Sequence, residues 1–79
     1  MIEEKYFEFD NNINQTVIKN IRKYRKAKGY TQEQLALMAE ISYDFMRKIE
    51  TGKSGFSVQT LYKLSVVLET GVDLLMGRK

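Results

Sequence analysis

The chain has 79 residues, enough for one small domain and too few for two independent hydrophobic cores. It contains no cysteine and no histidine, which excludes disulfides, thiolate metal sites and the most common general base at neutral pH. The formal net charge is +3, but residues 1–14 hold one basic and four acidic side chains, whereas residues 15–79 hold twelve basic and six acidic ones. The basic excess of the longer part makes a polyanionic partner the first hypothesis.

Residues 1–14 are expected to form an N-terminal arm, as a strand or an extended segment, ahead of a domain over residues 15–79. Tyr6, Phe7 and Phe9 make the arm aromatic, and its polarity partly alternates, as in a short strand. A first helix is predicted from near Asn12 or Asn14 to Gly29. Its apolar residues recur with helical spacing, at Val17, Ile18, Ile21 and Tyr24.

Three further helices are each predicted to begin at a hydroxyl N-cap. These caps are Thr31, Ser42 and Ser57, and the third helix should end at Thr51 and Gly52. A last turn or two is expected over residues 72–76. Five short helices with short connections predict an all-α domain. No apolar run is long enough for a membrane span or a secretory signal, so a cytoplasmic location is expected.

The second and third predicted helices are about three residues apart, between Ala39 and Ser42, which is the spacing of a helix-turn-helix. The segments RKAKGYTQEQLALMAEIS and FMRKIETGKSGFSVQTLYKLSVVLE closely resemble the phage-repressor and Cro-like helix-turn-helix family of the xenobiotic-response-element type. The resemblance runs from about Val17 to Arg78. It implies a five-helix lambda-repressor-like fold and a transcriptional regulator that binds double-stranded DNA by sequence, without a cofactor.

This family usually has glycine at two positions where the chain has Glu40 and Glu69. Glycine is favoured there because the backbone turns with a positive φ, so both glutamates are predicted to adopt a left-handed conformation. The resemblance also implies a buried ion pair between Arg25 on the first helix and Glu50 on the third. That pair would direct Arg25 towards a DNA phosphate.

By the docking mode of the family, the start of the third helix faces base edges. The expected base contacts are Tyr43, Asp44, Phe45 and Lys48. Asp44 can accept a hydrogen bond from cytosine or stabilise its helix N-terminus, and both roles stay open. Phe45 either packs on thymine methyl groups or is buried under the fourth helix. The expected contacts to the DNA backbone are Arg25, Gln32, Ser42, Arg47, Lys53, Ser54 and Ser57.

The regulator is expected to be a repressor that acts as a homodimer on a roughly palindromic operator, with Leu74, Leu75 and Met76 at the interface. An alternative function is a toxin-neutralising or adaptor module of the same fold, which would bind a partner protein through the arm. The TGKS sequence at residues 51–54 lacks the upstream glycine of a phosphate-binding loop, since Arg47 occupies that position. No cluster of metal ligands or paired catalytic groups is apparent, so no metal site and no enzyme is expected.

Overall fold

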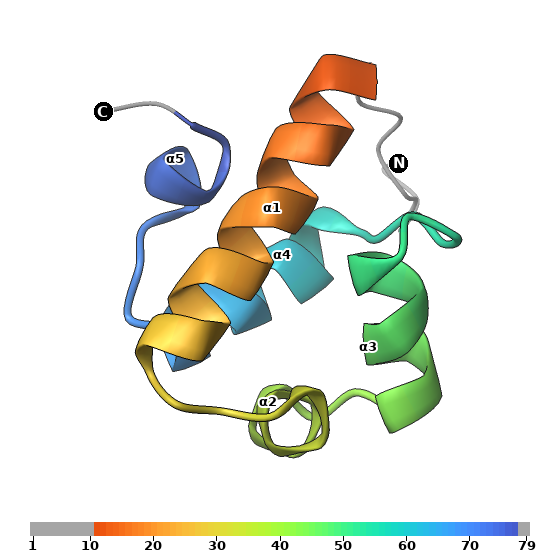
Figure 1. Ribbon diagram of the computed structural model, residues 1–79, viewed down its shortest axis with the longest axis vertical. Helices are drawn as coiled ribbons and strands as arrows, with labels where there is room; N and C mark the ends of the chain where they lie inside the picture. Colours follow the sequence, from red (N-terminus) through yellow and green to blue (C-terminus); the bar gives the residue numbers. More distant parts are fainter. Residues whose placement is uncertain (1–10, 78–79) are drawn as a thin grey trace, which may run out of the picture.

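The computed structural model describes the backbone of residues 11–77 and the side chains of residues 14–77. This part of the chain is all-α, as predicted, with five helices packed around one core (Figure 1). The long first helix crosses in front of the fourth, and the second and third lie at one end of the molecule (Figure 1). The helices are α1 (Asn11–Ala27), α2 (Gln32–Ala39), α3 (Tyr43–Glu50), α4 (Val58–Val67) and α5 (Val72–Leu75).

The first helix begins earlier than the sequence suggested. It starts at Asn11, so residues 11–14, which were expected in the arm, belong to α1. Tyr6, Phe7 and Phe9 lie outside the described residues, and whether they form a strand or an extended arm stays a prediction.

The starts of α2, α3 and α4 follow from their N-caps. The Thr31 hydroxyl accepts a hydrogen bond from the Gln34 amide at 3.0 Å, and the Gln34 side chain accepts one from the Thr31 amide at 2.9 Å. This reciprocal capping box satisfies two amides that a helix otherwise leaves unpaired. The hydroxyls of Ser42 and Ser57 each cap the amide three residues on. All three predicted caps are therefore confirmed.

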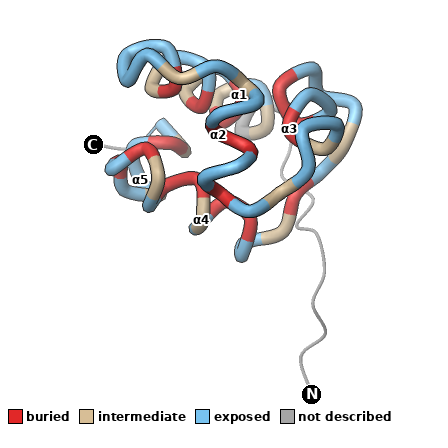
Figure 2. The backbone as a smooth tube through the Cα atoms, turned by 90° about the horizontal axis from the view of Figure 1, so that it is seen from below, coloured by how far each residue is buried: buried red, intermediate tan, exposed pale blue. Residues whose placement is uncertain are grey.

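The core lies between α1, α2, α3 and α4, and the buried segments of the tube face one another across it (Figure 2). Each helix directs its apolar face towards the core, which removes apolar surface from water. The fully or nearly buried hydrophobic residues are Val17, Ile18, Ile21, Leu35, Ala36, Ala39, Met46, Ile49, Phe56, Leu61, Leu64, Leu68 and Leu75.

Two glutamates adopt the left-handed backbone predicted for them. Glu40, in the turn between α2 and α3, has φ of 60° and ψ of 42°, and Glu69, after α4, has φ of 55°. A left-handed conformation costs a residue with a Cβ about 1 kcal/mol relative to glycine. The helix-turn-helix geometry is therefore kept although its turn lacks the favoured residue.

The short α5 packs against α1 with its buried side facing the core. Leu75 is fully buried, and the Asn20 side-chain amide of α1 donates hydrogen bonds to the carbonyls of Leu74 and Leu75, at 3.2 and 3.0 Å. The prediction of Leu75 as a dimer contact is therefore wrong, because its side chain fills the core of its own chain. Leu74 is 44% exposed and Met76 is half-buried, so only these two stay available.

None of the helices between residues 11 and 77 combines the length and the apolar composition needed to cross a bilayer.

Candidate nucleic-acid interface

The outer face of α3 carries most of the side chains predicted to contact bases. Tyr43, Asp44 and Lys48 are exposed, and so is Arg47. The Arg47 guanidinium stacks over the Tyr43 ring, with its central carbon 5.6 Å from the ring centroid. A cation over an aromatic ring at an exposed site stabilises this arrangement by about 0.5–1 kcal/mol. The face therefore presents a polar and aromatic surface.

The charges of α3 are partly neutralised on the helix itself. The Lys48 ammonium lies 3.1 Å from an Asp44 carboxylate oxygen, one turn away. Because both side chains are more than half exposed, the pair is weak and can exchange for contacts to a ligand. Asp44 also lies in the first turn, where a negative charge is favourable. Both roles considered for Asp44 thus stay possible in this structure.

Phe45 does not belong to this exposed face. Its side chain is half-buried and packs against the hydrophobic core. Part of the Phe45 ring is therefore taken up by packing against the core, and its contact with bases stays a prediction.

Beneath α3, a buried polar cluster joins α1, α2 and α3. The Glu50 carboxylate accepts hydrogen bonds from Arg25 Nε at 2.8 Å and Arg25 Nη2 at 3.1 Å. It also accepts one from Gln32 Nε2 at 2.9 Å, and Arg25 Nη1 donates to the Tyr30 carbonyl at 2.9 Å. The side chain of Glu50 is 1% exposed and that of Arg25 11%. The predicted Arg25–Glu50 pair is confirmed, and a bidentate pair of this kind is geometrically rigid.

The bond between Gln32 and Glu50 was not predicted. Residue types and spacing placed Gln32 at the start of α2, but they carried no sign that its amide would reach a carboxylate 18 residues away. The bond fixes the first residue of α2 to the last residue of α3. Gln32 therefore holds the two helices of the motif together, besides any contact to a ligand.

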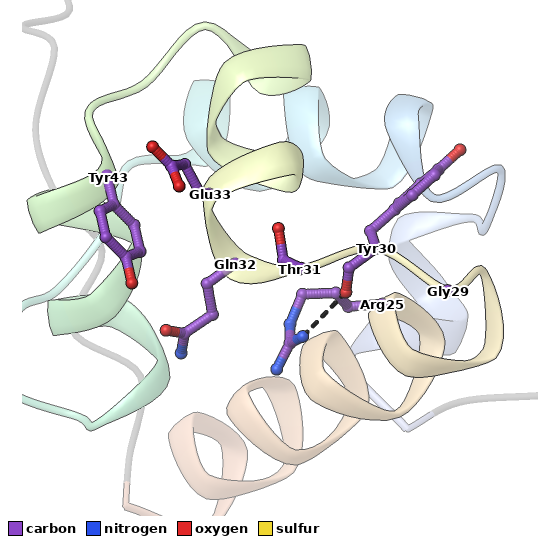
Figure 3. A pocket seen from close by; sticks show the side chains of 7 residues that line it. All are labelled: Arg25, Gly29, Tyr30, Thr31, Gln32, Glu33 and Tyr43. Atoms are coloured by element: carbon purple, nitrogen blue, oxygen red, sulfur yellow. Dashed lines mark hydrogen bonds between the residues drawn. The ribbon is translucent and has the colours of Figure 1, made fainter.

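An open hollow lies beside this cluster, between the start of α2 and the start of α3. Figure 3 shows the Arg25 guanidinium and the Gln32 amide pointing into the space below Tyr43. The first amides of α2 have no acceptor within the helix, and together with the helix dipole they favour an anion. The residues that line the hollow are Arg25, Gly29, Tyr30, Thr31, Gln32, Glu33 and Tyr43.

The remaining predicted backbone contacts are arranged around the N-caps and the loop after α3. The hydroxyls of Ser42 and Ser57 are engaged as caps. The loop folds back on α3, since the amides of Lys53 and Ser54 donate to the Lys48 carbonyl. Lys53 is exposed and Ser54 half-buried, so this loop presents a lysine close to the end of α3. No group of three or more acidic side chains able to hold a metal occurs in the part of the chain that the structure describes.

The sequence that forms this site matches a known protein family. A model of the helix-turn-helix family matches residues 21–75, more than half of the chain. The chain belongs to the helix-turn-helix family. This confirms the resemblance to phage-repressor-like transcriptional regulators, which are DNA-binding proteins and not enzymes.

The helix-turn-helix chain is similar to the transcriptional regulator SinR of Bacillus licheniformis. The two are 37% identical over 60 residues, which cover 75% of this chain and 54% of SinR. The chain thus spans about half the length of the SinR proteins that it matches. The crystal structure of SinR, the master regulator for biofilm formation, in complex with DNA is similar with a TM-score of 0.72 and 34% identity, covering 76% of this chain and 97% of that one. The SinR–SinI complex is similar as well, with a TM-score of 0.71 and 35% identity over 75% of this chain and 58% of that chain.

Proposed function

We propose that this helix-turn-helix protein regulates transcription by binding double-stranded DNA, with the outer face of α3 in the major groove. The observation that carries the proposal is the position of α3. Its exposed face is held by the buried Arg25–Glu50–Gln32 cluster at the same side as the hollow at the start of α2. The related SinR structure was solved with DNA bound, which supports DNA binding by this fold. Binding to chromosomal DNA requires a cytoplasmic location, which we propose as well.

In this mode the site residues divide into two groups. Tyr43, Asp44 and Lys48 would contact base edges, since they are exposed on the face that enters the groove. The backbone contacts would come from the side chains and amides around that face, where phosphates of the two strands pass. These are Arg25, Gln32, Ser42, Arg47, Lys53, Ser54 and Ser57.

DNA binding is tested by selecting bound sequences from random duplexes and measuring affinity at several salt concentrations. Because several phosphates would be neutralised, affinity should fall roughly 10³–10⁵-fold between about 50 and 200 mM salt. Lys53→Ala should weaken all sequences alike, and Lys48→Ala should change the preferred sequence. Lys19→Ala, an exposed lysine of α1, is the matched control and should have little effect. A response that is flat with salt would exclude the proposal.

A homodimer on a palindromic operator is part of the proposal. With Leu75 in the core, the α5 contacts reduce to Leu74 and Met76. A palindromic consensus from the selection would support a two-fold symmetric dimer, because the symmetry of an operator mirrors that of its protein. A single, asymmetric half-site would contradict it.

The alternative function, binding of a partner protein, has one supporting observation: the relative SinR forms a complex with the protein SinI. The aromatic and acidic residues 1–10 are the segment expected to serve it. Because α1 begins at Asn11, deleting residues 1–10 removes this segment without shortening any described helix. Loss of a co-purifying protein with retained DNA binding would support partner binding, whereas loss of the dimer would support a structural arm.

A further inference from the structure

A second hollow, separate from the one beside α3, lies between the end of α2 and the middle of α4. It shares no lining residue with the hollow that contains Arg25 and Gln32. Its lining is largely apolar, with one acidic and one basic side chain among it. The lining residues are Met38, Ala39, Glu40, Tyr62, Lys63, Val66 and Val67.

Three side chains of this hollow expose apolar surface to water. Met38 is 41% exposed, Val66 55% and Tyr62 61%. Tyr62 and Val66 are four residues apart on α4 and therefore lie on the same side of the helix. Exposed apolar side chains that cluster around one hollow, rather than being scattered singly, form a candidate binding surface. We call these three residues the α2–α4 patch.

Two opposite charges border the patch. Glu40 and Lys63 both line the hollow. Within the described range 11–77, neither side chain forms one of the ion pairs of the structure. Glu40 also occupies a left-handed turn position that favours glycine. A charged side chain therefore lies at the edge of the patch, although the left-handed backbone at this position favours glycine.

The two charges indicate which partner fits. In a two-fold symmetric interface the same patch occurs on both sides, so each charge meets its opposite only if the patch carries both signs. Glu40 and Lys63 meet that condition.

We propose that the α2–α4 patch is a self-association surface, in which Met38, Tyr62 and Val66 pack against the same residues of a second copy and Glu40 pairs with the second copy's Lys63. The patch contains no residue of the outer face of α3. It is also separate from the α5 contacts Leu74 and Met76. The inference does not depend on DNA binding and is measured without DNA.

The test uses the full chain carrying Leu74→Arg, which removes the main α5 contact, and measures mass against concentration by sedimentation equilibrium. The Leu74→Arg chain should still form a dimer. Adding Tyr62→Arg should raise the dimer dissociation constant by about tenfold or more, because a charge would be buried at the centre of the interface. Val58→Arg, the same change at a 49% exposed residue of α4 outside the hollow, is the matched control and should leave the constant unchanged.

Charge reversal identifies the pair. Glu40→Lys and Lys63→Glu should each weaken the dimer, and the double variant should restore it, because only a contact between these two residues across the axis is repaired by exchanging them. Melting temperatures of all variants show that the fold is retained. A Leu74→Arg chain that is monomeric at every concentration, an unchanged constant in Tyr62→Arg, or a double variant no better than the single ones would overturn the proposal.

Discussion

Two ion pairs connect the end of α1 to later parts of the chain, and they differ in almost every respect. Arg25 and Glu50 are joined by two hydrogen bonds, and their side chains are 11% and 1% exposed. Lys28 and Glu69 are joined through one ammonium group, and their side chains are 32% and 74% exposed. The two basic residues are only three positions apart on the same stretch of chain. The pairs therefore allow a direct comparison of the same kind of contact with and without water.

The comparison shows that surroundings set the energetic weight of an ion pair. Buried Glu50 relies on Arg25 and Gln32 to replace the water that its carboxylate has lost, so removing any partner leaves a buried charge. Exposed Glu69 regains water when Lys28 is removed, and dissolved salt screens the pair. We therefore expect the first pair to hold α1, α2 and α3 together and the second to add little.

The largest effect is expected for Glu50→Ala. It strands the Arg25 guanidinium and the Gln32 amide, at a cost of about 3–5 kcal/mol in the free energy of unfolding. For a domain of this size that is a large part of the total stability. Urea unfolding followed by circular dichroism measures the loss. Glu33→Ala, at an exposed residue, is the control, and a wild-type unfolding midpoint in Glu50→Ala would refute the role of the cluster.

Gln32→Ala should have the next largest effect. It removes one of three hydrogen bonds to the buried carboxylate, which corresponds to about 1.5–3 kcal/mol for a bond to a charged group. DNA affinity should fall as well, because the start of α2 loses its anchor on α3. Gln59→Ala, an exposed glutamine on α4, provides the control for helix propensity. Equal unfolding midpoints in the two variants would mean that the Gln32 bond contributes nothing.

Glu40→Gly should raise stability by about 1 kcal/mol, because glycine adopts the left-handed turn without strain. Glu69→Gly relieves the same kind of strain but also removes the exposed pair with Lys28. If that pair contributes as little as expected, the melting temperatures of the two variants should rise by similar amounts. A loss of stability in Glu69→Gly alongside a gain in Glu40→Gly would show that the exposed pair matters more than its burial suggests.

The smallest effect is expected for Lys28→Met, and it should depend on pH. The hydrogen bond from Lys28 lowers the pKa of Glu69 below its ordinary 4.5, and the same bond raises the pKa of Lys28 above its ordinary 10.5. Stabilisation by Glu69 is therefore present at neutral pH and lost as the pH falls through its lowered pKa. Stabilisation by Lys28 is lost as the pH rises through its raised pKa. The small difference in melting temperature between wild type and variant should disappear at both extremes and at high salt.

Much of the fold could be predicted because its signals are local. A hydroxyl cap such as Ser42 finds its partner, the Phe45 amide, three residues away, so the chain itself supplies both groups. The left-handed turns at Glu40 and Glu69 follow from positions where the family has glycine. The Arg25–Glu50 pair also came from the resemblance, and composition alone gives no reason to join residues 25 positions apart.

The incorrect prediction, Leu75 as a dimer contact, concerns a side chain whose burial is set by a distant segment. Phe45 and Leu75 have residue types that suit either an exposed contact or a core, and local spacing does not distinguish the two. Leu75 lies inside because α5 packs on α1, more than 50 residues earlier, where Asn20 binds the last carbonyls of α5. For this reason Leu75, the central residue of the predicted dimer surface, cannot contact a second copy.

The sequence by itself determined the all-α class, the caps that begin α2, α3 and α4, the family, and the basic excess that points to DNA. The tertiary structure alone decided that Leu75 belongs to the core, that Phe45 packs partly against it, and that Gln32 is bound to Glu50. It also decided that Met38, Tyr62 and Val66 form one exposed patch between Glu40 and Lys63. Hydrogen bonds within one helical turn depend on neighbours in the chain, whereas burial depends on which helices pack together, and that is settled only when the whole chain is folded.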